Sequence, residues 1–210
     1  MFCIKPSLLR LLAALIILPL AANAQQGEPY VYGELGYGRG AEGMLKIAIN
    51  TVFAHNNILT LNYCFASKRA DNLPPDYNPN DLLGKHWPQK SISMAGISYG
   101  KMIFSTSPMV RFSLKAGVVA GVINMPTDFV PVPQNGGWFS LTGPGQYNYS
   151  MQRDFAIGLV LDPTVELPLG RDLGITAGPY LNLNAQNPIV AFDVCVAFGR
   201  IRGKPGRTGI

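Results

Sequence analysis

Residues 110–118 read VRFSLKAGV, and apolar and polar side chains alternate along the whole stretch. In an extended chain, Phe112 and Leu114 would share one face while Arg111 and Lys115 share the other. An α-helix would instead bring apolar residues together every three or four positions. The stretch therefore predicts a β-strand with one apolar face and one face that carries charge.

The same period-two pattern recurs along the rest of the chain, with no helical stretch between the repeats. Two connections are long, 68–90 and 124–150, and the others are short. In an up-and-down arrangement these are the third and the fifth connections, so both project from the same rim, as in a transmembrane barrel. The sequence predicts an all-β fold, an eight-stranded antiparallel up-and-down transmembrane β-barrel. The expected strands lie at 30–38, 44–53, 59–65, 91–104, 110–118, 155–161, 173–182 and 192–198.

The N-terminal stretch has the three regions of a secretory signal peptide. Lys5 and Arg10 precede an apolar run at 11–20 (LLAALIILPL), and residues 22–24 (ANA) supply the small side chains of a cleavage site before Gln25. The apolar run is too short to span a bilayer as a helix, which needs about 20 residues. The expected organisation is a cleaved signal peptide (1–24), a barrel (25–198) and a basic C-terminal tail (199–210).

The composition indicates which face of the strands meets lipid. Only 14% of the residues are charged, whereas 48% are hydrophobic, and a soluble domain would carry about 25% charged residues. The polar face of the strands is rich in Gly, Ala, Ser, Thr and Asn, with one or two charges per strand. Such a face suits the crowded interior of an eight-stranded barrel. The apolar face would then contact lipid, although a secreted lipocalin-like barrel would show the same alternation inverted.

The net charge of +5 does not indicate nucleic-acid binding. Six of the 17 basic residues lie in the leader and the tail, which leaves 11 against 12 acidic residues in between. No basic patch with interleaved aromatic residues is present, so nucleic acid is not an expected partner. No metal-ligand spacing or phosphate-binding fingerprint occurs either, so we expect neither a metal nor a cofactor. Cys64 and Cys195 are expected to be free, because their offset along the barrel exceeds the Cα separation of about 7 Å that a disulfide tolerates.

Three stretches carry a resemblance to known proteins: YVYGELGYG at 30–38, GITAGPYLNLN at 174–184 and FDVCVAFG at 192–199. The chain resembles the small bacterial outer-membrane β-barrel family, in particular the short barrels of Bacteroidetes-like bacteria. The resemblance implies a location in the bacterial outer membrane, with lipid as a partner. Phe198 is similar to the terminal aromatic residue that directs barrel insertion, but here a basic tail follows it.

The functional expectation rests on the two long connections, because side chains fill the lumen of an eight-stranded barrel and leave no channel. We expect a monomeric, non-enzymatic surface or envelope-structure protein that contacts an extracellular protein or glycan through these loops. An interfacial aromatic girdle is the alternative explanation for their aromatic residues. The alternative function is a lipid A-modifying enzyme that would use His86 and Ser93. The candidate recognition residues are Tyr77, Trp87, Trp138, Phe139 and Tyr147.

Charged residues on the inward faces predict two strand registers. Arg111 with Glu166 and Lys115 with Asp162 give the same sum of residue numbers, 277, so one antiparallel register would form both ion pairs. Pairing Glu34 with Lys46 would set the first hairpin to a sum of 80, with 39–41 as its loop. Two prolines, Pro163 and Pro179, fall inside strand patterns, where each would remove a ladder hydrogen bond.

Overall fold

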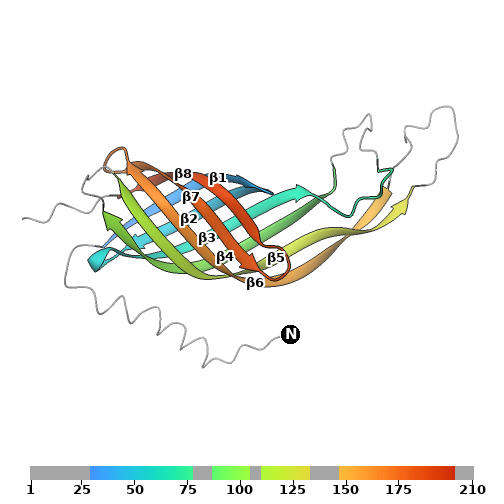
Figure 1. Ribbon diagram of the computed structural model, residues 1–210, viewed down its shortest axis with the longest axis horizontal. Helices are drawn as coiled ribbons and strands as arrows, with labels where there is room; N and C mark the ends of the chain where they lie inside the picture. The colour runs from blue at the N-terminus through green and yellow to red at the C-terminus, as the bar shows by residue number, and fades with distance from the viewer. Residues whose placement is uncertain (1–28, 78–86, 105–109, 133–146, 202–210) are drawn as a thin grey trace, which may run out of the picture.

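A computed structural model describes residues 29–77, 87–104, 110–132 and 147–201. They form eight antiparallel strands that close into one barrel, in which each strand pairs with the next and β8 pairs with β1 (Figure 1). The strands are β1 (Tyr30–Gly40), β2 (Gly43–Val52), β3 (Asn57–Arg69), β4 (Gln89–Phe104), β5 (Arg111–Pro131), β6 (Tyr147–Pro168), β7 (Leu173–Asn184) and β8 (Ile189–Gly199). The predicted fold class is confirmed. The expected signal peptide lies outside the described residues.

The outer surface of the barrel is apolar. Phe155 and Ile157 on β6 are 65% and 67% exposed, and outward positions on all the other strands are similarly apolar. A soluble lipocalin-like barrel would bury its apolar face, so this exposure pattern excludes it. No helix within the described ranges is long and apolar enough to cross a membrane.

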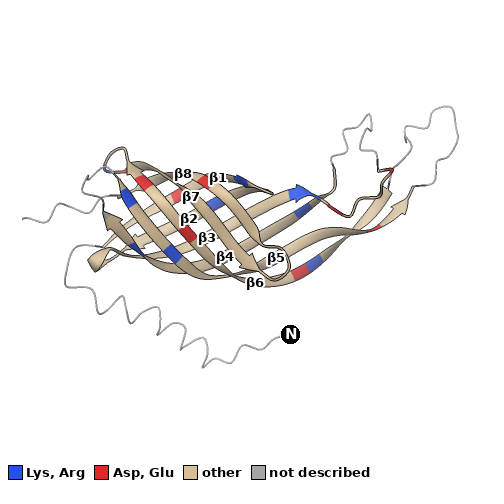
Figure 2. Ribbon diagram, in the orientation of Figure 1, with Lys and Arg blue, Asp and Glu red and all other residues tan. Residues whose placement is uncertain are grey.

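Charged residues occur along the length of the barrel (Figure 2), but those in the middle are buried in the lumen. Along the described strands, the charged residues that point outward are Arg39, Arg69 and Arg153 toward one rim and Lys101 toward the other. A charge at the bilayer midplane costs about 2–4 kcal/mol, whereas near the interface the cost falls to about 0–1 kcal/mol. The outward charges therefore place the lipid-facing band between these two levels.

The two long connections lie at the same rim, as the count of connections predicts, but the second is shorter than expected. The first long connection, between β3 and β4, spans 70–88. The second long connection, between β5 and β6, spans 132–146. Both ends of the expected loop at 124–150 therefore belong to strands instead. They pair with each other from Asn124 opposite Arg153 to Pro131 opposite Tyr147. Cross-strand hydrogen bonds stabilise these flanks although their side chains lack a clear apolar alternation.

Side chains fill the lumen in layers. One apolar cluster, which includes Tyr32 and Ile201, lies at the rim with the short turns. A second, which includes Met94 and Tyr180, lies toward the rim with the long connections. Seven charged side chains, none more than 3% exposed, lie between or beside them: Glu34, Lys46, Arg111, Lys115, Asp162, Glu166 and Asp193. The charged layer is thus enclosed by apolar packing on both sides.

The expected register of β5 with β6 is present. Arg111 lies opposite Glu166 and Lys115 opposite Asp162, and Lys115 Nζ is 3.0 Å from Asp162 Oδ2. At the other pair, Glu166 accepts a hydrogen bond of 2.8 Å from Tyr32. Arg111 Nη1 donates to the Ile201 carbonyl at 2.7 Å.

The expected register of the first hairpin is wrong by two residues. Lys46 lies opposite Gly36, and Glu34 lies opposite Ala48. Instead of pairing with Glu34 on the adjacent strand, Lys46 crosses the lumen. Its Nζ is 2.9 Å from Asp162 Oδ2 and 2.6 Å from Asp193 Oδ2.

The shifted register puts Lys46 opposite a glycine, and its side chain reaches carboxylates of β6 and β8. At Gly36 a Cβ atom would overlap the Cys195 side chain and the backbone of Val194. A glycine opposite Lys46 therefore leaves β1 close to β8. Two carboxylates across the lumen compensate the buried ammonium better than the single neighbouring carboxylate could. Glu34 instead lies 3.9 Å from Lys115 Nζ.

The two strand prolines face each other. The ladder between β6 and β7 is interrupted between Leu161, which lies opposite Leu181, and Val165, which lies opposite Ala177. The register is the same on both sides of this interruption, so Pro163 lies opposite Pro179. Neither proline has an N–H to donate, so the two missing donors coincide at one interruption of the ladder. Both strands continue past this point without a bulge or an end.

Cys64 and Cys195 are free and buried, as predicted. The geometric reason is a lateral separation around the barrel. Cys64 lies opposite Lys46, Lys46 opposite Gly36, and Gly36 opposite Cys195. Two whole strands, β1 and β2, therefore separate the thiols, and neighbouring strands lie about 4.8 Å apart.

The start of the expected C-terminal tail is part of the barrel. Gly199, with a φ of 104°, ends β8 and turns the chain inward. Its N–H donates to the Asp172 carbonyl, and the Ile201 N–H donates to the Arg171 carbonyl, both at 3.0 Å. Ile201 is 1% exposed, so it closes the lumen at this rim.

Replacing Lys46 with methionine should destabilise the barrel by about 3–5 kcal/mol, because Asp193 would then be buried without its cationic partner. Urea unfolding in phospholipid vesicles, followed by tryptophan fluorescence, measures the change. A double-mutant cycle should give a larger coupling energy for Lys46 with Asp193 than for Lys46 with Glu34.

Lys101→Met is the matched control for this measurement. Lys101 points outward near the border of the lipid band, so its loss should change the free energy of unfolding by no more than about 1 kcal/mol. Equal unfolding midpoints for Lys46→Met and Lys101→Met would contradict the central role of Lys46.

Candidate functional site

The ends of β5 and β6 extend beyond the rest of the barrel as a two-stranded hairpin (Figure 1). Pairing of β4 with β5 ends at Asn124, and pairing of β6 with β7 ends at Gly158. Beyond these points, 125–131 of β5 and 147–152 of β6 pair only with each other. The hairpin therefore presents both faces outside the barrel wall.

A β-bulge in β5 sets the orientation of the hairpin side chains. The register sum is 277 up to Thr127 opposite Ser150 and 278 from Val130 opposite Asn148 onward. The bulge contains Asp128, whose φ is 52°, and its carboxylate accepts a hydrogen bond of 2.6 Å from Ser150. One extra residue moves the following side chain to the other face of a strand. As a result, Phe129 joins the face that carries the tyrosines of β6.

Five aromatic rings from three segments meet on this face. We call them the aromatic cluster: Tyr77, Trp87, Phe129, Tyr147 and Tyr149. Ring centroids of Tyr77 lie 5.6 Å from Trp87 and 6.0 Å from Tyr147. Phe129 lies 5.7 Å from Tyr149. These separations are in the range of favourable aromatic pairs, which contribute about 0.5–1.5 kcal/mol each.

Hydrogen bonds hold the 70–77 segment against the hairpin. The Tyr147 hydroxyl donates to Asp76 Oδ1 at 2.6 Å, and Asn72 Nδ2 donates to the Pro126 carbonyl at 2.8 Å. The hydrogen bond to the Asp76 carboxylate raises the pKa of Tyr147, because ionisation would break the bond and place two negative charges together. Burial raises the pKa of Tyr77.

A cation packs on the other side of the cluster. The Arg69 guanidinium carbon lies 3.2 Å from the centroid of the Trp87 ring, and such cation–π contacts contribute about 0.5–1 kcal/mol at exposed sites. The Ala70 N–H donates to the Pro88 carbonyl at 3.0 Å and closes the base of this connection. Trp87 is thereby fixed to the end of β3.

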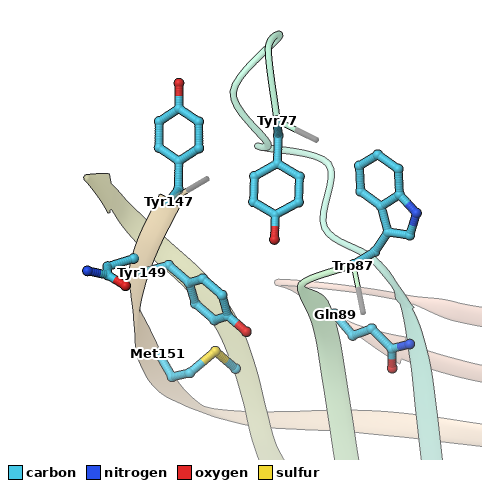
Figure 3. A pocket seen from close by; sticks show the side chains of 7 residues that line it. Tyr77, Trp87, Gln89, Tyr147, Tyr149 and Met151 are labelled. Carbon is cyan, nitrogen blue, oxygen red and sulfur yellow. The ribbon is translucent and has the colours of Figure 1, made fainter. Parts of the chain in front are cut away.

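The cluster borders a cleft of about 740 Å³ (Figure 3). Tyr147, Tyr149 and Met151 of β6 form one side, and Trp87 and Gln89 at the start of β4 form the other. Tyr77 and Asn148 complete the lining. Ligand pockets commonly have volumes of about 300–1,000 Å³ and combine aromatic walls with a few polar groups.

The cleft lies on the water side of the membrane border. Arg69 and Arg153 are the outward charges nearest this rim on β3 and β6, and the cluster lies beyond both along the chain. An interfacial girdle would lie at the level of the border or below it. The exposed positions of Tyr149 and Met151, at 43% and 50%, are therefore exposed to water.

Three of the five predicted recognition residues come together here: Tyr77, Trp87 and Tyr147. Trp138 and Phe139 lie outside the described residues. The candidate enzyme pair is not placed either, because His86 is outside the described residues as well. Across 29–77, 87–104, 110–132 and 147–201 there is no group of residues that could hold a metal ion.

The sequence analysis did not identify the residues that the strands contribute to the cleft, namely Gln89, Asn148 and Met151. It also did not identify the packing of Phe129 against Tyr149. Gln89 and Met151 fall at strand ends where the alternation gives no signal. Phe129 reaches the cluster only through the bulge, and a positive φ at a non-glycine residue is not visible in sequence.

No family model matches the chain, and no curated protein sequence matches it. Solved structures do. The N-terminal β-barrel domain of Pseudomonas aeruginosa OprF is 11% identical, with a TM-score of 0.52 over 82% of this chain and 98% of that one. The fold is that of a bacterial outer-membrane β-barrel. Neisserial surface protein A is also 11% identical, with a TM-score of 0.50 over 81% of this chain and 96% of that one. The narrower similarity to barrels of Bacteroidetes-like bacteria stays a prediction.

Replacing Asp76 with asparagine should lower the pKa of Tyr147 toward the ordinary value of 10.0, because the negative charge that opposes ionisation is removed. Since the folded-state pKa is raised, the Tyr147–Asp76 contact is complete below pH 10 and is lost as the pH rises through the raised pKa. Ultraviolet difference titration of the phenolate measures this change.

Tyr147→Phe identifies which part of the titration belongs to Tyr147, because the chain has nine tyrosines. It is made both in the unmodified chain and in the Asp76→Asn variant, and subtracting the matching curve isolates one phenol in each case. The hydrogen bond is disproved if the isolated pKa is the same in the unmodified chain and in the Asp76→Asn variant.

Proposed function

We propose that this chain is a non-enzymatic surface protein of the bacterial outer membrane, and that the aromatic cluster contacts an extracellular partner. The apolar outer band supports insertion into lipid, and the filled lumen argues against solute passage through the barrel. The part of the molecule that is free to act is then the surface beyond the lipid border.

The observation that carries this proposal is the aromatic cluster beside the hairpin, in which Tyr149 is exposed and the other four rings are half-buried. Exposed apolar surface of this kind commonly marks an interaction site, and Tyr and Trp are enriched among residues that dominate binding energy. The bond between Tyr147 and Asp76 and the contact of Arg69 with Trp87 hold the rings in place before any partner arrives. A preorganised surface loses less entropy on binding.

Cells that display the chain should adhere to surfaces coated with its partner, and the double variant Tyr77→Ala/Tyr147→Ala should adhere at least tenfold less. Loss of a dominant interface aromatic costs about 2 kcal/mol or more. The assay counts cells retained on a panel of purified extracellular matrix proteins and immobilised oligosaccharides, relative to cells that lack the chain.

Tyr99→Ala is the matched aromatic control, because Tyr99 is exposed on the outer face of β4 within the lipid band. It should adhere like the unmodified chain. Heat-dependent gel mobility of the outer-membrane fraction verifies that each variant is inserted and folded. The proposal fails if no coated surface retains displaying cells above the level of cells without the chain, or if the double variant adheres normally.

A further inference from the structure

The cleft beside the aromatic cluster combines ring faces with a side-chain amide. Gln89 is exposed and lines it together with Tyr77, Trp87 and Tyr149. An amide group offers a donor and an acceptor at once. A pyranose ring has the complementary chemistry, since it has an apolar face of C–H groups and an edge of hydroxyls that both donate and accept.

The charges around the cleft oppose an ionic ligand. None of the seven lining residues is charged. Nearby charges already have partners: Arg69 packs on Trp87, Asp76 accepts from Tyr147, and Asp128 accepts from Ser150. Among the described residues, an anionic ligand would meet the Asp76 carboxylate beside Tyr147, and a cationic ligand would meet the Arg69 guanidinium on Trp87. Recognition of a charged group needs an oppositely charged partner, or the desolvation penalty is not compensated.

The size and rigidity of the site suit a short oligosaccharide. The volume of about 740 Å³ lies within the range of pockets for small organic ligands. Tyrosine and tryptophan have only two side-chain torsions, so they offer a large contact area at a low entropic cost. The strands β4 and β6 fix the two sides of the cleft, and Tyr77 lies between them (Figure 3).

From these observations we propose that the cleft binds an uncharged saccharide, with the rings of Tyr77, Trp87 and Tyr149 against the sugar face and the amide of Gln89 on its hydroxyls. This inference deepens the proposed surface-recognition function and rests on it. It names the class of ligand rather than a particular sugar.

Fluorescence of Trp87 provides a direct test. The chain has two tryptophans, so a Trp138→Phe background leaves Trp87 as the only one. The full barrel in phospholipid nanodiscs, free of detergents with sugar headgroups, is titrated with uncharged oligomers of glucose, mannose and N-acetylglucosamine. At least one series should give a saturable fluorescence change. Its apparent Kd should be the same at about 50 mM and about 500 mM salt, because salt screens ion pairs and none contributes to this binding.

Variants of the lining locate the site. Tyr149→Ala and Gln89→Leu should each weaken the apparent Kd by about tenfold or more, whereas Tyr99→Ala in the lipid band should leave it unchanged. Dodecyl maltoside below its micellar concentration should compete if a glucose oligomer binds, because it presents the same headgroup. Heat-dependent gel mobility verifies that each variant is folded.

The outcomes separate this inference from the proposed function. If no uncharged oligosaccharide gives a saturable signal while displaying cells still adhere to a protein-coated surface through Tyr77 and Tyr147, the saccharide inference is overturned and the surface role stands. Saturable binding of heparin fragments alone, with strong salt dependence, would also overturn it in favour of an anionic ligand. Absence of both oligosaccharide binding and cell adhesion would overturn both proposals.

Discussion

The barrel is organised around one buried ammonium group. Lys46 on β2 reaches Asp162 on β6 and Asp193 on β8, so a single side chain connects opposite walls of the lumen. Because a charge buried without a partner costs several kcal/mol, any register that moves one of these three residues away from the others is strongly disfavoured. The constraint acts across strands that are distant in sequence, and it helps to fix the relative heights of β2, β6 and β8.

Much of the fold could be predicted because it depends on local pattern. Period-two alternation gives the strands, the parity of the connections gives the rim with long loops, and repeated charge spacing gives the β5–β6 register. The first hairpin could not be predicted in the same way. Its register depends on what Lys46 reaches across the lumen and on the close approach of β8 to Gly36, and both are tertiary contacts. A rule that pairs charges only on adjacent strands has no access to them.

The candidate site could be predicted in kind but not in composition. Clustering of aromatic residues near the long connections identified Tyr77, Trp87 and Tyr147. The extension of β5 and β6 beyond the barrel, however, arises from backbone pairing that the side-chain pattern does not specify. The bulge at Asp128 then changes which residues share a face, so the contribution of Phe129 follows from a backbone conformation. The pairing of Pro163 with Pro179 belongs to the same class, because each proline alone argues against a strand and only their alignment resolves the conflict.

The inward turn at Gly199 has a consequence for how the molecule is completed. Ile201 touches the β6–β7 turn through Arg171 and receives a hydrogen bond from Arg111 of β5. Ile201 also belongs to one apolar cluster with Tyr30 and Tyr32 of β1, so its full set of contacts requires that β8 has joined β1. Residues 199–201 therefore act as a latch that engages after closure of the cylinder and adds contacts that an open sheet would lack. The chain thus reaches Ile201 inside the mouth of the barrel, and the joint between the first and last strands is covered from the lumen side.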